Sequence, residues 1–273
     1  MATTTTPRTG YAPVNGLKLY YEIYGSGQPL ILLHGGYGMV GMFATLLPGL
    51  AEDRQVIGLE MQGHGHTGDI DRPLSPEAMA DDVAATIAAL GFERADILGY
   101  SMGAGVALQT AIRHPEVVGK LVILSGTHRR SGLHDSVRAA FAAMNTDDMT
   151  EQLKQSPIYE FYSAVAPNLG DWPNLVAKTT AMLREDYDWS AGVATIAAPT
   201  LIALGDADML PPAVAAELFG LLGGGKGDGS APHNQLAILP GTDHFTILER
   251  TDLLLPILKA FFAEAQAAAV GEA

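Results

Sequence analysis

Cysteine is absent from the 273-residue sequence. Without a thiol, the chain forms no disulfide, uses no thiolate nucleophile and holds no zinc or iron–sulfur cluster through cysteine. The sequence also lacks an apolar run near the roughly 18 to 20 residues of a membrane span, and its polar start has neither the basic residues nor the apolar stretch of a secretory signal. We therefore expect a cytoplasmic protein.

Basic residues are scarce. The chain has 16 Lys and Arg against 30 Asp and Glu, which gives a formal net charge of −14. Such a surplus of negative charge repels the phosphates of nucleic acids and anionic lipids. We expect no nucleic-acid partner and no membrane partner. A small-molecule substrate is the expected partner, and the oligomeric state, monomer or homodimer, stays open.

Short apolar runs bounded by turn residues occur along most of the chain, in which 48% of the residues are hydrophobic. Such runs are typical of buried parallel strands. Two β-rich stretches, residues 11–14 and 18–24, flank Asn15-Gly16, and Asn-Gly is a strong signal for a β-hairpin. The apolar runs expected to be strands are residues 30–33, 55–59, 95–98, 120–124, 200–204 and 236–239.

Helical patterns lie between these runs. In residues 76–90 apolar residues recur every three or four positions, which indicates an amphipathic surface helix. Ser75 is its expected cap, and Pro76 is suited to the first turn. Asp81 and Asp82 are expected to face away from the core.

A second apolar stripe, in residues 254–262, predicts another helix, with Pro256 in its first turn, where a missing N–H does no harm. Strands that alternate with helices along the chain indicate an α/β fold. In such a fold a mostly parallel sheet is covered by helices on both faces.

The alternation stops between residues 126 and 195, where helical patterns with aromatic residues continue without a convincing strand run. We interpret this segment as a helical lid inserted into the sheet domain. The expected division is a core domain of residues 1–125 and 196–273 and a lid of residues 126–195. No single lid residue is assigned to a substrate pocket, because apolar side chains at helical spacing more often belong to a core.

The most specific motif is Gly-Tyr-Ser-Met-Gly at residues 99–103, directly after the expected strand 95–98 and directly before a helical pattern. This Gly-x-Ser-x-Gly context is that of a nucleophile elbow, in which a sharp strand-to-helix turn exposes the serine hydroxyl above the sheet. The N-terminus of the helix that follows favours a developing negative charge nearby. Ser101 is therefore the candidate nucleophile.

A serine hydroxyl is a weak nucleophile and needs a base within hydrogen-bond reach, which an acid holds in one tautomer. Two candidate acids, Asp206 and Asp208, follow the expected strand 200–204. The candidate base, His244, follows the strand 236–239. Open α/β sheets place their ligands at the carboxyl ends of their strands, and the order Ser, Asp, His is the one expected for this architecture.

The motifs at strand ends are Leu-His-Gly-Gly at 33–36, Gln-Gly-His-Gly at 62–65, Gly-Tyr-Ser-Met-Gly at 99–103, Gly-Asp-Ala-Asp at 205–208 and Gly-Thr-Asp-His at 241–244. On these motifs the sequence resembles the α/β-hydrolase superfamily over nearly its whole length. The resemblance implies a roughly eight-stranded sheet, and it selects Asp208 over Asp206 because the acid of that family usually falls three residues after the glycine ending its strand. It also implies an oxyanion hole made of the backbone N–H groups of Gly36 and Met102, each worth about 3 kcal/mol of transition-state stabilisation.

The sequence departs from the family at one place. The family often has Asp before its Gly-His-Gly segment, whereas Glu60 and Met61 occupy that neighbourhood here. We interpret this difference as variation in a structural turn.

The other histidines are expected to take no part in chemistry. His34 belongs to the family's His-Gly motif and is expected to be structural. His64 and His66, followed by Asp69 and Asp71, loosely resemble a metallo-hydrolase site, but the spacing differs and no later histidines complete a ligand set. We therefore expect no metal and no cofactor. Solvated surface is expected for His128, His134 and His233, and a helix end for His114.

The sequence is thus interpreted as a serine hydrolase that cleaves a small or moderately apolar carboxylic ester through an acyl-enzyme on Ser101. A lactonase, a carbon–carbon bond hydrolase and a perhydrolase on the same triad remain alternatives, because this fold hosts many chemistries. Epoxide hydrolases and haloalkane dehalogenases of this fold use an aspartate nucleophile, so Ser101 argues against both. An alternative of another class is a non-catalytic ligand-binding member of the fold, against which the intact set of Ser101, Asp208 and His244 argues.

Overall fold

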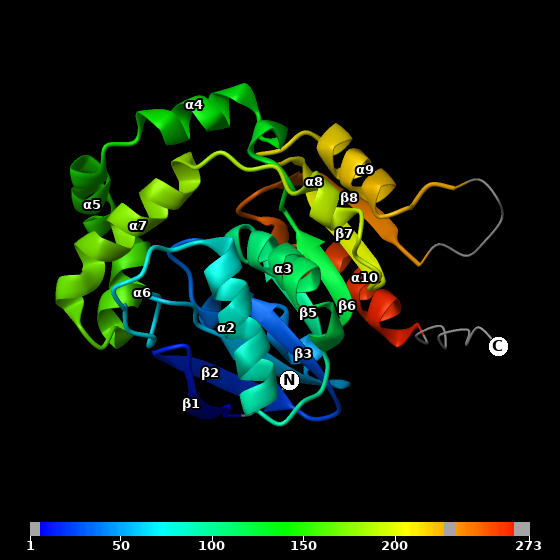
Figure 1. Cartoon of the computed structure of the whole chain (residues 1–273), viewed down its shortest axis with the longest axis horizontal. Helices are drawn as coiled ribbons and strands as arrows, with labels where there is room; N and C mark the ends of the chain where they lie inside the picture. Colours follow the sequence, from blue (N-terminus) through cyan, green and yellow to red (C-terminus); the bar gives the residue numbers. More distant parts are fainter. Residues whose placement is uncertain (1–5, 227–232, 265–273) are drawn as a thin grey trace.

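The computed structural model describes residues 6–226 and 233–264, and within them eight strands form one sheet (Figure 1). The strands are β1 (Arg8–Val14), β2 (Leu17–Gly25), β3 (Gln28–Leu33), β4 (Arg54–Leu59), β5 (Ala95–Tyr100), β6 (Val118–Leu124), β7 (Thr200–Ala207) and β8 (Gln235–Asp243). Their order in the sheet is β1-β2-β4-β3-β5-β6-β7-β8. β2 runs antiparallel to β1 and β4, and the other neighbouring pairs are parallel. The predicted α/β fold with a mostly parallel, roughly eight-stranded sheet is confirmed.

The expected hairpin joins β1 to β2. Asn15 and Gly16 have φ angles of 47° and 85°, and this left-handed pair gives a two-residue turn whose twist matches that of the strands. Val14 pairs with Leu17 across the turn. Main-chain pairing continues as far as Arg8, so both strands are longer than their apolar pattern indicates.

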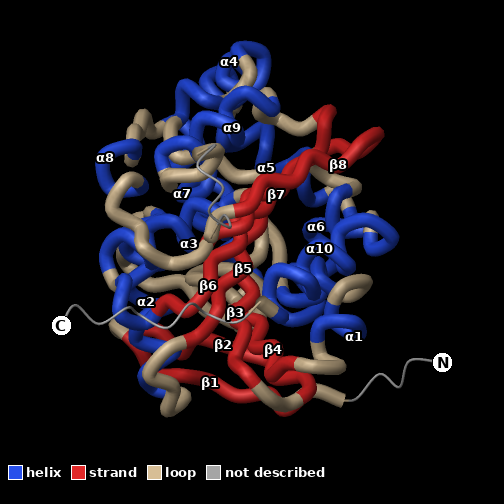
Figure 2. The backbone as a smooth tube through the Cα atoms, turned by 90° about the vertical axis from the view of Figure 1, so that its right-hand side faces the viewer, coloured by secondary structure: helices blue, strands red, loops and turns tan. Residues whose placement is uncertain are grey.

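Helices cover both faces of the sheet, as the alternating pattern predicts (Figure 2). They are α1 (Leu47–Leu50), α2 (Pro76–Ala89), α3 (Met102–Arg113), α9 (Pro212–Leu221) and α10 (Thr251–Ala263). Ile31 and Leu33 of β3 belong to the core beneath α2, α3 and α9, whereas Leu30 and Leu32 belong to the core beneath α1 and α10. β3 therefore buries side chains on both sides of the sheet. No helix in the described part of the chain is long and apolar enough to cross a membrane.

The start of α2 agrees with the sequence pattern, because the Ser75 hydroxyl accepts a hydrogen bond of 3.2 Å from the Ala78 N–H. The predicted outward position of Asp82 is wrong. Asp82 is only 2% exposed, and its carboxylate pairs with the guanidinium of Arg72 at 2.6 Å and accepts from the Asn15 side chain at 2.9 Å. Arg72 and Asn15 compensate the buried negative charge of Asp82. The pattern of α2 alone would place this charge in solvent.

The predicted place of Pro256 is also wrong. The helix α10 begins at Thr251, so Pro256 lies inside it rather than in its first turn. Arg250 starts the helix earlier because its carbonyl accepts from the N–H groups of Leu253 and Leu254. A proline at this position leaves the carbonyl one turn earlier without its helical donor.

The segment from 126 to 195 places most of its helices above the carboxyl ends of the strands, whereas its last helix, α8 (Ser190–Val193), lies beside α3 and α9 (Figure 1). The helices before α8 are α4 (Asp135–Ala143), α5 (Thr146–Lys154), α6 (Pro157–Val165) and α7 (Trp172–Arg184). An isolated antiparallel bridge joins Arg129 to Asp188, so the two chain connections of this segment run side by side. Its role as a lid, and the division of the chain at residues 125 and 196, stay predictions.

One histidine of this segment is placed differently from expectation. His128 is fully buried, so the prediction of a solvated surface position is wrong. The paired connections explain its burial: the Trp189 N–H donates to the His128 carbonyl at 2.9 Å, and the Arg130 N–H donates to the Tyr187 carbonyl at 3.0 Å. Burial lowers the pKa of His128.

Candidate active site

Ser101 stands at the turn between β5 and α3. Its φ of 55° and ψ of −115° are unusual for a residue with a side chain, and they describe the strained turn expected of a nucleophile elbow. Glycines make this turn possible. A Cβ on Gly99 would lie 2.1 Å from the Gly103 carbonyl oxygen, and a Cβ on Gly103 would lie 2.2 Å from the Leu33 carbonyl oxygen.

The structure brings the three predicted side chains together. The Ser101 Oγ lies 2.9 Å from His244 Nε2, and His244 Nδ1 lies 2.7 Å from Asp208 Oδ1. Asp208 and His244 are 6% and 7% exposed, so both interactions are largely shielded from water. The arrangement can pass a proton from the serine hydroxyl to the imidazole while the carboxylate fixes the tautomer.

Of the two candidate acids, the structure places Asp208 beside His244. Asp208 Oδ1 also accepts from the Met209 N–H at 2.7 Å, and Oδ2 accepts from the Ser125 hydroxyl at 2.6 Å. Asp206 is exposed and its carboxylate accepts from the Thr242 N–H at 3.1 Å. Asp206 therefore stabilises the loop before His244, and hydrogen bonds to the backbone lower its pKa.

Tyr100, which precedes Ser101, contacts both the backbone and the imidazole of His244. Its hydroxyl donates to the His244 carbonyl at 2.7 Å, and its ring centroid lies 5.4 Å from the imidazole. Burial raises the pKa of Tyr100, and the charges of Asp208 and Asp243 raise it further. The phenol is thus a neutral donor at ordinary pH, able to hold this carbonyl.

The loop after β3 passes close to Ser101. A Cβ on Gly35 would lie 3.4 Å from the Ser101 Cβ. A Cβ on Gly36 would meet only the Thr179 methyl group, at 3.8 Å, so this side of the loop faces space rather than packed core. α3 starts at Met102, and the first N–H groups of a helix have no partner within it. Gly36 and Met102 therefore lie on elements that flank Ser101, where the sequence expects the oxyanion hole.

His34 is held inside the protein. Its Nε2 accepts from the Met61 N–H at 3.1 Å, so its proton is on Nδ1, which donates to the Gly35 carbonyl at 2.8 Å. Burial lowers the pKa of His34 to about 3. A permanently neutral ring that bonds two backbone segments fits the expected structural role.

The residues considered as a possible metal site make hydrogen bonds to different protein groups. His64 Nδ1 lies 2.9 Å from the Gln62 carbonyl, and burial lowers the pKa of His64 to about 4. His66 Nδ1 lies 2.9 Å from the carboxylate of Glu60. Asp69 accepts from the Lys178 ammonium at 2.7 Å. His64 Nδ1, His66 and Asp69 thus each contact a different protein group, whereas the buried His64 Nε2 has no hydrogen-bond partner in the described part of the chain.

Glu60, the departure from the family motif, organises the turn that follows it. Its buried carboxylate accepts from the His66 N–H at 2.6 Å and lies 3.4 Å from the Val40 N–H. Burial raises the pKa of Glu60, and the bonds from His66 and Val40 oppose that rise. The contacts agree with a structural turn.

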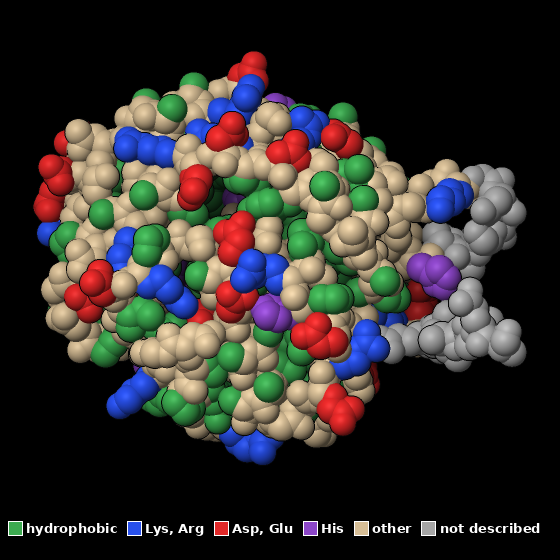
Figure 3. Space-filling model, in the orientation of Figure 1, with side chains coloured by type: hydrophobic (Ala, Val, Ile, Leu, Met, Phe, Trp, Pro, Cys, Tyr) green, Lys and Arg blue, Asp and Glu red, His purple; other side chains and the backbone are tan. Residues whose placement is uncertain are grey.

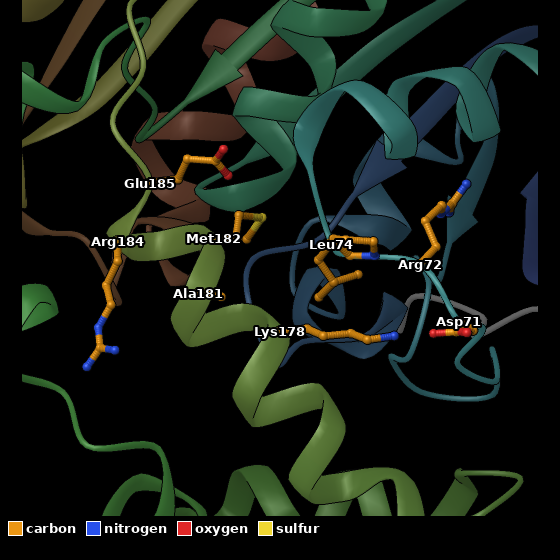
Figure 4. Close-up of a pocket in the computed structure, with 9 residues that line it drawn as sticks. Asp71, Arg72, Leu74, Lys178, Ala181, Met182, Arg184 and Glu185 are labelled. Carbon is orange, nitrogen blue, oxygen red and sulfur yellow. The ribbon is translucent and has the colours of Figure 1, made fainter.

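A surface pocket of about 520 Å³ lies between α7 and the loop of residues 71–74, and Lys178 extends from α7 toward this loop (Figure 4). Neither Ser101 nor His244 lines it, so this pocket is separate from the site. The same face is also hollowed below α4, and hydrophobic side chains are visible inside the hollow (Figure 3).

Comparison with known proteins identifies the family. The family model described as alpha/beta hydrolase fold matches residues 28–144. The AB hydrolase superfamily protein YisY of Bacillus subtilis is 30% identical over 217 residues, which are 72% of this chain and 80% of YisY. The chain belongs to the α/β-hydrolase superfamily.

Individual relatives differ in their named activities. The 2-hydroxymuconate semialdehyde hydrolase of Pseudomonas sp. is 35% identical over 113 residues, 40% of each chain. Among solved structures, the meta-cleavage product hydrolase of Pseudomonas fluorescens matches with a TM-score of 0.73 and 23% identity, over 95% of this chain and 98% of that one. This structural likeness concerns the fold.

Two contacts of the site were missed by sequence reasoning. Ser125 follows the apolar run 120–124 and so lies at a strand end, which is a weak signal for a site residue. Its contact with Asp208 depends on β6 and β7 being neighbours in the sheet. The contact of Tyr100 with the His244 carbonyl likewise depends on the path of the loop after β8.

Proposed function

We propose that this chain is a serine hydrolase that cleaves a small or moderately apolar carboxylic ester through an acyl-enzyme on Ser101. The observation that carries the proposal is the hydrogen-bonded series from Ser101 through His244 to Asp208, with distances of 2.9 and 2.7 Å. The strained backbone of Ser101 supports it as well. Such strain destabilises a fold and persists mainly where function requires it.

In the proposed reaction the Ser101 Oγ attacks the ester carbonyl carbon while His244 Nε2 takes the hydroxyl proton. The N–H groups of Gly36 and Met102 bind the oxyanion of the tetrahedral intermediate. Collapse breaks the bond to the leaving alkoxide, which receives the proton from His244. Water then attacks the acyl-enzyme by the same steps and releases the carboxylic acid.

Hydrolysis of a carbon–carbon bond flanked by carbonyls is a second candidate, and it rests on the 35% identity with a 2-hydroxymuconate semialdehyde hydrolase. Lactone hydrolysis and perhydrolysis would use the same three side chains. The absence of cysteine supports a cytoplasmic setting for any of these activities. We also propose residues 126–195 as the lid over the substrate.

Hydrolysis of a chain-length series of p-nitrophenyl esters by wild type and Ser101→Ala tests the proposal. We expect activity in the wild type, an optimum at a short or medium acyl chain, and loss of roughly a thousandfold or more in kcat for the variant. Equal activity of both proteins refutes Ser101 as the nucleophile. No activity in the wild type, together with turnover of a vinylogous 1,5-diketone, favours the carbon–carbon hydrolase instead.

A further inference from the structure

A second surface pocket lies between the hairpin of β1 and β2, the loop of residues 66–70 and the chain after α6. Its volume is about 760 Å³, which is large enough for a small organic ligand. Neither Ser101 nor His244 lines it, so the pocket is separate from the proposed active site. We call it the hairpin pocket.

One face of the hairpin supplies an aromatic wall. Tyr11 and Pro13 of β1 pair with Tyr20 and Lys18 of β2, so these four side chains lie on one face of the hairpin. The ring centroids of Tyr11 and Tyr20 lie 5.3 Å apart, and the His66 ring stacks on Tyr20 at 4.1 Å. Tyr20 is only 7% exposed, whereas Tyr11 is 53% exposed. Tyr11 therefore offers the pocket an aromatic ring that the fold leaves largely uncovered.

The other two segments add apolar surface to the hairpin pocket. Ile70 lines it from the loop, and Pro167 lines it from the chain after α6. Ile70 Cδ1 lies 4.0 Å from the position of a Cβ on Gly16, and Pro167 Cγ lies 3.7 Å from that of a Cβ on Gly68. These contacts bring the three segments together around the pocket. An exposed ring beside two aliphatic side chains suits a flat, apolar ligand.

Lys18 gives the hairpin pocket its charge. It is exposed, and its ammonium has no hydrogen bond or ion pair within residues 6–226 and 233–264. The acid in the lining, Asp69, is neutralised, because it accepts from the Lys178 ammonium at 2.7 Å. His66 directs its Nδ1 to the buried carboxylate of Glu60, at 2.9 Å. Lys18 is thus the charged lining group that remains available to a ligand.

We propose that the hairpin pocket is a binding site for an aromatic carboxylate, a property beyond the proposed hydrolase activity. The carboxylate accepts a hydrogen bond from the Lys18 ammonium, and the ring packs against Tyr11, Ile70 and Pro167. Lys18 and Tyr11 are diagonal neighbours on one face of the hairpin, which suits a ligand that carries its charge directly on a ring.

The charge of the ligand follows from the same residues. A single ammonium fits a monoanion such as a carboxylate, whereas phosphate sites usually gather several donors. The net charge of −14 opposes an anion only weakly at this site, because salt screens charges beyond roughly 10 Å.

Titration with 2-naphthoate, followed through the backbone amide NMR signals of the protein, tests the site. The neutral isostere 2-naphthamide is the control ligand, because it keeps the rings and lacks the charge. For 2-naphthoate we expect a dissociation constant of about 0.1–1 mM, with signal changes at residues 16–18 and 66–70. 2-Naphthamide should bind at the same residues with lower affinity.

Three variants separate charge from packing. Lys18→Gln should weaken the binding of 2-naphthoate about threefold to tenfold and leave that of 2-naphthamide unchanged. Tyr11→Ala should weaken the binding of both ligands. Lys226→Gln removes the same charge from a residue after α9, far from β1 in the strand order, and should change neither affinity. All three side chains are exposed, so the fold should persist in each variant.

No binding of 2-naphthoate by the wild type overturns the site, and so does an equal affinity of the wild type and Lys18→Gln. Signal changes around Ser101 and His244 instead of the hairpin also overturn it, because they would place the carboxylate in the active site. The titration contains no ester, so a failure of the proposed hydrolase activity leaves this test intact.

Discussion

The Ser125 hydroxyl donates to Asp208 Oδ2 at 2.6 Å, while Oδ1 of the same carboxylate faces His244 Nδ1 at 2.7 Å. Ser125 has a φ of 53°, and it is 3% exposed. The backbone after β6 is thus held in a left-handed conformation at the residue that contacts the acid. We infer that Ser125 is a positioning residue, which fixes the plane of the carboxylate and shares its charge.

Replacing Ser125 tests this role. Ser125→Ala removes the hydroxyl and should lower kcat about tenfold or more, because a hydrogen bond to a buried carboxylate contributes roughly 1.5–3 kcal/mol. Ser125→Gly removes the same hydroxyl and also relieves the positive φ, so it should be more stable than Ser125→Ala with a similar loss of kcat. Full activity of both variants in ester hydrolysis would contradict a positioning role.

The elbow glycines predict a sharp contrast in stability. Gly103→Ala should destabilise the fold by about 2–3 kcal/mol or more, because its Cβ would lie 2.2 Å from the Leu33 carbonyl oxygen, and backbone cannot move aside. Gly220, an exposed residue of α9 with no atom near its absent Cβ, is the matched control. Gly220→Ala should stabilise by about 0.5–1 kcal/mol. Urea unfolding measures both, and equal stability of the two variants contradicts the close approach.

The buried His64 predicts a pH dependence of stability. Its pKa is about 4 in the folded chain against an ordinary value of 6.5. Between these values the unfolded chain binds a proton that the folded chain does not, so the free energy of unfolding falls as pH decreases through this window, by up to ~1.4 kcal/mol per pH unit. His34, with a pKa of about 3, acts in the same direction.

Urea unfolding of wild type and His64→Gln at about pH 7 and about pH 5 checks this sign. The variant lacks one of the buried histidines whose pKa is lowered, so its stability should fall less on acidification than that of the wild type. Its amide can still donate to the Gln62 carbonyl that His64 faces. An equal loss of unfolding free energy in the two proteins between these pH values would show that His64 does not resist protonation.

Local features of the site were predictable from the sequence because their geometry is set by neighbouring residues. The turn at Ser101 needs only a strand, two small flanking residues and a helix, and all three are visible in the sequence. His244 was predictable because it follows a strand run, and so was the pair Asp206 and Asp208, of which the resemblance to the family selected Asp208. The sheet then brings strand ends to one edge.

Features that depend on packing between distant segments were not predictable. Asp82 has the spacing of a solvent-facing residue in α2, and its burial results from Arg72 and Asn15 reaching it from other segments. Ser125 meets Asp208 because Leu124 pairs with Ala203, a register that no local pattern encodes. The hairpin pocket likewise depends on the chain after α6 reaching the loop of residues 66–70.

The most direct test of the central claim is covalent labelling of the nucleophile. Wild type and Ser101→Ala are incubated with an aryl alkylphosphonate, and the masses of the intact proteins and of their peptides are measured. The reagent transfers its phosphonyl group to an activated serine, and the product mimics the tetrahedral intermediate. We predict a gain of one phosphonyl group on the wild type, located on the peptide that contains Ser101, and no gain on the variant. Labelling at another residue, or an unlabelled Ser101 in a wild type that hydrolyses esters, would contradict the account.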